Sequence, residues 1–249
     1  MTQLTSIRAG FASYPVRLTL FGICTFALFA VIFFATTIYP PEWLSAENGP
    51  LELLQVALIG CASVTLFFAA FKSTRGRAAL TIMASLAGYA SARETDSLFE
   101  SLLFDDAYKY FAALPLMLVC VSAVWRDRSN LRRDFAWVMN QRCTTIFAIG
   151  GTYLFCICQI LDSPAFWGGP NESDWAQSGQ HAHAVKQMVE EFCEVFAYVL
   201  IGFAGVEAAA SVLQNSHIES ASEDDSSEAD DSRSTIRIAS FPNRRRRAA

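Results

Sequence analysis

Charged residues are scarce in this sequence. Only 17% of its 249 residues are Asp, Glu, Lys or Arg, while 53% are hydrophobic. A soluble domain of this length would interrupt its apolar stretches at short intervals, but here the charges fall in bands between long apolar stretches. Those stretches are close to the ~20 residues that a helix needs to cross ~30 Å of hydrocarbon. The composition therefore argues against a soluble globular domain.

Several common motifs are also missing. The sequence has no P-loop, no G-x-G-x-x-G and no G-x-S-x-G segment, and it lacks the E-x-x-H pattern of di-iron helix bundles. Its seven cysteines lie mostly within apolar stretches, so we expect small buried side chains rather than a disulfide framework or a zinc site. No nucleic-acid partner is expected.

Six apolar stretches predict an all-α, polytopic membrane protein with six transmembrane helices. Pro40 and Pro41 end the first stretch, and Pro50 precedes the second, where proline is tolerated at a helix start. The first stretch is too long for the apolar core of a signal peptide, so we expect it to be retained. The predicted spans cover residues 18–38, 51–71, 78–103, 110–125, 144–161 and 184–213.

Lys and Arg are distributed unevenly over the predicted loops. One side of the membrane would carry ten of them and the other side only one or two. Because basic loops stay in the cytosol, both termini are predicted to be cytosolic, in the cell membrane or, for a Gram-negative source, the inner membrane. The predicted parts are a cytosolic N-terminal segment (1–17), a transmembrane domain (18–213) and a disordered cytosolic tail (214–249), acidic and then polybasic.

Ionisable residues gather in the half of the predicted spans that is farther from the cytosol. At 1.5 Å per residue from the cytosolic boundary, Arg93 lies about 22 Å up, and Asp96 and Glu194 lie about 27–28 Å up. Glu52 and Asp162, on the second and fifth spans, reach about the same depth. One charge at the bilayer centre costs roughly 2.5–3.5 kcal/mol, so we expect these residues to face a shared interior or a water-filled pocket.

The spacing on the third and sixth spans points to the same pocket. Each span carries four polar residues separated by 4, 3 and 4 positions, namely Tyr89, Arg93, Asp96 and Glu100, and His183, Gln187, Glu190 and Glu194. Residues so spaced share one face of a helix. The two spans are therefore predicted to form walls of one polar site.

The predicted site has an excess of acids. Eight carboxylates compete for two nearby basic residues, Arg93 and Lys186; the acids are Glu52, Glu94, Asp96, Glu100, Asp162, Glu190, Glu191 and Glu194. Crowded carboxylates either hold protons or bind a cation. The alternative is a structural ion pair in which Arg93 ties two helices together. Glu207, deeper on the sixth span, is expected to be a neutral, hydrogen-bonded carboxylic acid.

Three functions are compatible with this pattern. The first is a metal-dependent, hydrolase-like membrane enzyme with a lipid-like substrate, in which a divalent ion activates a water molecule. The second is a small proton- or cation-coupled transporter, in which a second copy of the chain would supply a missing half. The third is a membrane sensor or assembly factor in which the polar cluster is structural. Membrane lipids and a homo-oligomer are the expected partners.

The enzyme hypothesis assigns roles to particular residues. The metal, whether Zn, Mn, Fe or Mg, would be bound by Glu52, Glu190, Glu194 and His183. The catalytic residues would be Glu94, Asp96, Glu194 and Arg93, with Arg93 holding an anionic group or the developing negative charge.

Overall fold

The structure, a computed structural model, describes residues 13–46, 48–163, 166 and 180–239. Side chains are described within these ranges except for 101, 162, 180–183 and 216 onward. The described residues are helical or lie in short connections, and no strand occurs among them. The chain divides into two units, Met1–Ala210 and Ser211–Ala249. The second unit contains the last part of helix α12.

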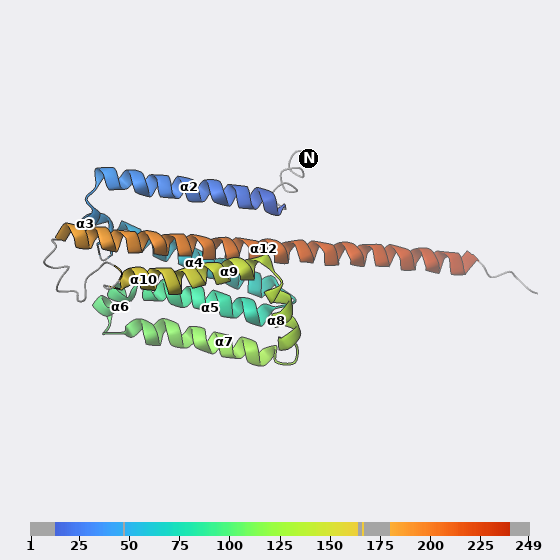
Figure 1. Ribbon diagram of the computed structural model, residues 1–249. Coiled ribbons are helices and arrows are strands. Elements are labelled where there is room, and N and C mark those ends of the chain that lie inside the picture. Colours follow the sequence, from blue (N-terminus) through green and yellow to red (C-terminus); the bar gives the residue numbers. More distant parts are fainter. Residues whose placement is uncertain (1–12, 47, 164–165, 167–179, 240–249) are drawn as a thin grey trace, which may run out of the picture. The chain divides into compact units, whose positions relative to one another are not determined.

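Five helical segments are long and apolar enough to cross a membrane (Figure 1). They are α2 (Tyr14–Ile38), α4 (Pro50–Lys72), η1 with α7 (Lys109–Ala113 and Leu114–Arg126), α9 with η2 and α10 (Arg142–Thr152, Tyr153–Cys158 and Gln159–Asp162), and the Ala184–Asn215 part of α12 (Gln180–Ala239). This arrangement fits a multi-pass membrane protein, as the sequence predicts.

The third predicted span, 78–103, is not one helix. It is divided into α5 (Arg77–Arg93) and α6 (Asp96–Leu102), with the break at Glu94 and Thr95. The Thr95 hydroxyl donates back to the carbonyl oxygens of Ser91 (3.3 Å) and Ala92 (3.1 Å). Such side-chain hydrogen bonds to the local backbone compete with the helical pattern, which explains why the prediction of one continuous helix is wrong here.

Proline starts three of the helices. Pro15, Pro41 and Pro50 lie in the first turns of α2, α3 (Pro41–Leu44) and α4, where the missing N–H costs nothing. At the end of the bundle where α2 and α5 begin, α8 (Leu131–Met139) connects α7 to α9 and packs against α5. Consecutive helices α4, α5 and α7 pack next to one another.

Helix α2 runs antiparallel to α12. The rings of Phe21 and Phe203 stack with their centroids 4.2 Å apart, and Phe29 contacts Phe192 and Phe196 farther along the two helices. Most other large side chains of α2 are exposed on the outside of the bundle, where the membrane would cover them. Aromatic contacts therefore hold α2 beside α12, although the helix contributes little to the core.

The interior of the bundle is built from small residues on α4, α5 and α12. The Ser63 hydroxyl donates to the Ala84 carbonyl oxygen (2.8 Å), which ties α4 to α5. Ala204 and Ala208 of α12 are buried, and Gly205 lies against the backbone of Ala62 on α4. Small residues let membrane helices approach closely, so these three helices form the centre of the bundle.

Two further predictions concern residues outside this centre. The structure describes α12 as far as Ala239, through part of the segment that the sequence predicts to be a disordered tail. All seven cysteines are free, as predicted, but Cys24, Cys61 and Cys156 are exposed on helix surfaces rather than buried.

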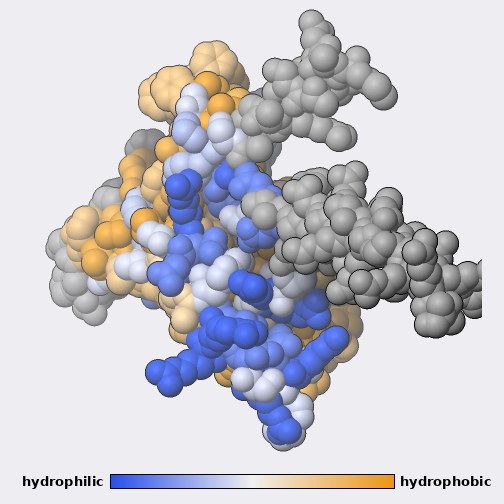
Figure 2. Space-filling view, turned by 90° about the vertical axis from the view of Figure 1, so that its right-hand side faces the viewer, coloured by the Kyte–Doolittle hydropathy of each residue, from blue (hydrophilic) through white to orange (hydrophobic). Residues whose placement is uncertain are grey.

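Basic residues collect at one end of the bundle, which we call the basic end. They lie at the end of α4, the start of α5, the end of α7, and around α8 and the start of α9: Lys72, Arg75, Arg77, Arg126, Arg128, Arg132, Arg133 and Arg142. Figure 2 looks at the molecule from this side, where hydrophilic side chains gather between hydrophobic flanks. The predicted separation of basic and acidic ends is thus present in the fold.

Candidate functional site

The opposite end of the bundle carries the acidic residues, and we call it the cluster end. Here α4 and α12 begin and α5 ends (Figure 1). The topology therefore brings Glu52 and Gln55 of α4, Arg93 and Glu94 at the end of α5, and the start of α12 to one place. We call Gln55, Arg93, Glu94, Glu190, Glu191, Glu194 and Tyr198 the polar cluster.

Gln55 links α4 to α12 inside this cluster. Its side chain is completely buried, and its amide nitrogen donates to the Glu191 carboxylate and to the Glu191 carbonyl oxygen (3.3 Å). The amide oxygen of Gln55 is also buried and has no hydrogen-bond partner among the described residues. Leaving a buried acceptor without a hydrogen bond costs free energy, so a donor that came close to this oxygen would form a favourable hydrogen bond.

Tyr198 links α12 to the end of α5. Its side chain is 1% exposed, and its hydroxyl donates to Glu94 Oε1 over 2.8 Å. The guanidinium of Arg93 is close enough for its charge to act on Glu94, Glu194 and Tyr198. The third and sixth predicted spans therefore meet, as a shared site requires.

Glu194 differs from its neighbours in the cluster. The charges of Glu94, Glu190 and Glu191 all act on it, and so does the charge of Arg93. Nevertheless, no hydrogen bond or ion pair to Glu194 occurs within the part of the chain that the structure describes. Three acids surround a carboxylate that has no specific donor, so it is the member of the cluster best placed to take up a proton or a cation.

Other predicted site residues have separate partners. Glu190 pairs with Lys186 (3.0 Å), one turn earlier on α12. Glu52 accepts the backbone N–H of Asn48 (2.5 Å), and its charge acts on Glu191. Asp96 accepts the N–H of Ser97 (2.6 Å) at the start of α6, where an acid stabilises the first turn. Its charge still acts on Glu94 at the edge of the cluster.

The polar stripe predicted on the third span does not form as one face, because the helix breaks in its middle. Glu100 is exposed and accepts the N–H of Asp106 (3.3 Å) in the following loop. The ring of Tyr89 faces that of Tyr108, with centroids 6.3 Å apart. Neither residue joins the hydrogen bonds of the cluster. Arg93 and Asp96 are the members of the stripe whose charges act on the cluster.

The predicted metal site is not supported. No group of three or more His, Cys, Asp or Glu side chains in the described ranges is arranged to hold a metal ion. Glu190 is paired with Lys186, Glu52 is directed to the Asn48 backbone, and the His183 and Asp162 side chains lie outside the described residues. The described carboxylates interact through their charges and through the donors Gln55 and Tyr198 instead.

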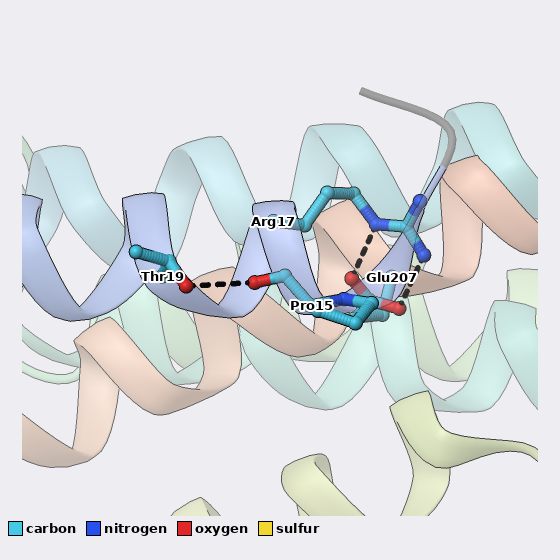
Figure 3. Close-up of polar contacts among 4 residues, drawn as sticks. All are labelled: Pro15, Arg17, Thr19 and Glu207. Carbon is cyan, nitrogen blue, oxygen red and sulfur yellow. Dashed lines mark hydrogen bonds and ion pairs between the residues drawn. The ribbon is translucent and has the colours of Figure 1, made fainter. Parts of the chain in front are cut away.

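An ion pair near the basic end is a feature that the sequence did not predict. The Arg17 guanidinium donates to both carboxylate oxygens of Glu207, over 2.6 and 2.9 Å (Figure 3). The side chains of Arg17 and Glu207 are only 11% and 2% exposed. Glu207 is hydrogen-bonded, as expected, but its partner is a guanidinium, so it is one half of a buried, bidentate pair that joins α2 to α12.

A signal for this pair was present in the sequence. Arg17 is the last residue of the predicted cytosolic segment 1–17, but in the structure it lies in the first turn of α2. Glu207 lies about 9 Å from the cytosolic boundary of the last predicted span at 1.5 Å per residue. Comparing depths for opposite charges, and not only for acids, would have brought the two residues together.

Comparison with known proteins adds no family or relative. No protein-family model matches the chain, and neither does any curated protein or solved structure.

Proposed function

We propose that this protein is a small proton-coupled membrane transporter in which Glu194 takes up and releases the proton. The observation that carries the proposal is the position of Glu194 among Glu94, Glu190 and Glu191, without a hydrogen-bond or ion-pair partner among the described residues. Glu94 and Glu191 have the donors Tyr198 and Gln55, which favour their charged forms. Glu194 lacks such a donor among the described residues. Its charged form is stabilised by the positive charge of Arg93 instead.

The buried Gln55 oxygen supports the same function. It has no donor in the described part of the chain, and a protonated carboxyl group in the cluster would supply one. Uptake of a proton by Glu194 would reduce the repulsion between the acids. The cluster would then alternate between a charged form and a neutral form, which is the property that a proton-coupled site needs.

The proposed topology has six crossings, with the basic end in the cytosol. Five crossings are the segments described above, and α5 would be the sixth. The excess of basic residues at one end supports this orientation. The polar cluster would then lie near the side of the membrane opposite the cytosol, where it can exchange protons with that compartment.

A metal-dependent enzyme is the second candidate. The observation in its favour is Arg93, whose positive charge lies beside the carboxylates and would hold an anionic group of a lipid-like substrate. The metal would require His183 in addition to Glu190 and Glu194. This function makes a specific prediction that the transporter does not make, namely a bound divalent ion in the purified protein.

Infrared spectroscopy tests the proton site directly. The purified protein in lipid should give a C=O band from a protonated carboxyl group that appears and disappears as the pH is changed. We expect Glu194→Gln to remove this band. Glu100→Gln is the matched control, because Glu100 is also a glutamate at the same end of the bundle but is exposed and bonded to the following loop.

Proton uptake into liposomes tests the transport function. With a pH-sensitive dye inside the vesicles, the wild type and Glu100→Gln should admit protons under a membrane potential, whereas Glu194→Gln should not. An unchanged carboxyl band and unchanged uptake in Glu194→Gln would contradict the proposal. A stoichiometric divalent metal in the wild type that is lost in Glu194→Ala would also contradict it and would favour the enzyme.

A further inference from the structure

A large apolar groove lies between α2, α4 and α12, away from the polar cluster. Its volume is about 560 Å³, within the ~300–1,000 Å³ that is usual for small-molecule sites. Leu20 and Leu28 of α2, Leu58 and Ala62 of α4, and Gly202 and Val206 of α12 are among the residues that line it. The lining is almost entirely apolar and is open to the side, so an occupant would enter from the membrane.

Contacts of α2 with α4 and α12 lie on both sides of the groove. Near the basic end, the Arg17–Glu207 ion pair and the stacked rings of Phe21 and Phe203 fix α2 to α12. Toward the cluster end, Phe29 and Ile32 join a hydrophobic core with residues of α4 and α12. Between these attachments the three helices do not close on one another. The gap is about the length of the 11 residues from Phe21 to Ile32, or ~16 Å.

Two arginines, Arg17 in the lining and Arg142 nearby, lie toward the basic end of the groove. Arg142, at the start of α9, lies over the ring of Tyr14, with its guanidinium carbon 4.1 Å from the ring centroid. Tyr14 precedes Arg17 by one helical turn, so Arg142 and Arg17 are close to the same opening. Glu207 neutralises Arg17. Arg142 has no ion pair within the described ranges, which leaves one positive charge at the mouth.

We propose that this groove binds an anionic phospholipid, with one acyl chain between α2, α4 and α12 and the phosphate beside Arg142. The apolar lining fits the chain, and the net positive mouth fits the negative headgroup. This site is separate from the polar cluster and does not depend on the proposed transport function. Bound lipid would act as a structural part of the bundle that fills the space beside α2.

Two glycines allow a matched test of the acyl-chain site. A Cβ atom added at Gly202 meets no atom within 4 Å and would point a larger side chain into open space, and Gly202 lines the groove. Gly22 on α2 is equally open but does not line the groove. We therefore expect Gly202→Leu to lose most of the lipid that copurifies with the wild type, and Gly22→Leu to retain it. Mass spectrometry of detergent-washed protein measures the amount.

Two arginines allow a matched test of the headgroup site. Arg128 lies over Trp125 at the basic end, as Arg142 lies over Tyr14. Tyr14 lies one turn before the lining residue Arg17, whereas Trp125 belongs to α7, which contributes no residue to the lining. Native mass spectrometry with added phosphatidylglycerol should show a roughly fivefold loss of affinity in Arg142→Gln and none in Arg128→Gln. Phosphatidylcholine with the same chains should bind the wild type more weakly.

Three results would overturn the proposal. The first is equal lipid retention in Gly202→Leu and Gly22→Leu. The second is equal affinity of the wild type for the two phospholipids, because an electrostatic mouth must distinguish them. The third is an equal effect of Arg142→Gln and Arg128→Gln. The arginine pair keeps the test decisive even if the larger side chain at Gly202 prevents folding.

Discussion

Removing Arg17 should destabilise the protein much more than removing Glu207. Arg17→Met leaves a carboxylate that is 2% exposed without its two hydrogen bonds of 2.6 and 2.9 Å. Breaking a buried ion pair in this way costs ~3–5 kcal/mol, because the remaining charge stays desolvated. Glu207→Leu leaves Arg17, which is 11% exposed and lies in the first turn of its helix. The long side chain of Arg17 can turn toward the membrane surface, so we expect Glu207→Leu to lower the free energy of unfolding by ~1–3 kcal/mol.

The double substitution provides the decisive comparison. Arg17→Met with Glu207→Leu replaces both charges by apolar groups of similar size, and such replacements are often neutral or stabilising. The double variant should therefore be more stable than Arg17→Met alone. The measurement is reversible unfolding in mixed micelles by titration with a denaturing detergent. Equal losses for the two single variants, or a double variant as unstable as the sum of both, would refute the assignment of a buried pair.

Three further predictions concern packing, hydrogen bonding and topology. Gly150→Ala should lower the free energy of unfolding by ~1–3 kcal/mol, because the added Cβ would lie 2.9 Å from a side chain of α12. The control Gly151→Ala meets nothing within 4 Å and should be neutral or slightly stabilising in the same unfolding assay. Tyr198→Phe should lower the free energy of unfolding by ~1.5–3 kcal/mol, because it removes the hydrogen bond to Glu94. Tyr153→Phe removes only a 3.6 Å contact to the sulfur of Cys193 and should have a smaller effect. Reporter tags at the two termini should be accessible from the same side of the membrane.

The membrane-spanning helices could be predicted from the sequence because their signal is local. Each span requires about 20 apolar residues, and that requirement can be read without knowing the neighbours. The predicted span 51–71 matches α4, Pro50–Lys72, to within a residue at each end. The break between α5 and α6 was missed because it depends on how Thr95 uses its hydroxyl, and apolar periodicity carries no information on that choice.

The polar cluster was predicted in outline but not in its pairings. Depth counting predicts Arg93 and Glu194 in the same half of the spans, and in the structure the charge of Arg93 acts on Glu194. Gln55 and Tyr198 were not selected, because an uncharged polar residue in an apolar stretch is a weak signal. Their roles depend on which helix faces which. That information resides in the packing of small residues such as Ser63 and Gly205, not in the charges.

Helix α5 is the sixth crossing of the proposed topology, although it is not one of the five strongly apolar helices. It has 17 residues, which at 1.5 Å per residue is ~25 Å, and it leads from the basic end at Arg77 to the polar cluster at Arg93. Its Ser, Thr and Gly residues make it less apolar than the others, but Thr81 and Ser85 are buried against neighbouring helices rather than exposed. A helix enclosed by other helices does not need a lipid-compatible surface. The small polar residues that make α5 less apolar than the five candidate spans are therefore packed inside the bundle, and the helix ends where Arg93 and Glu94 lie near Tyr198.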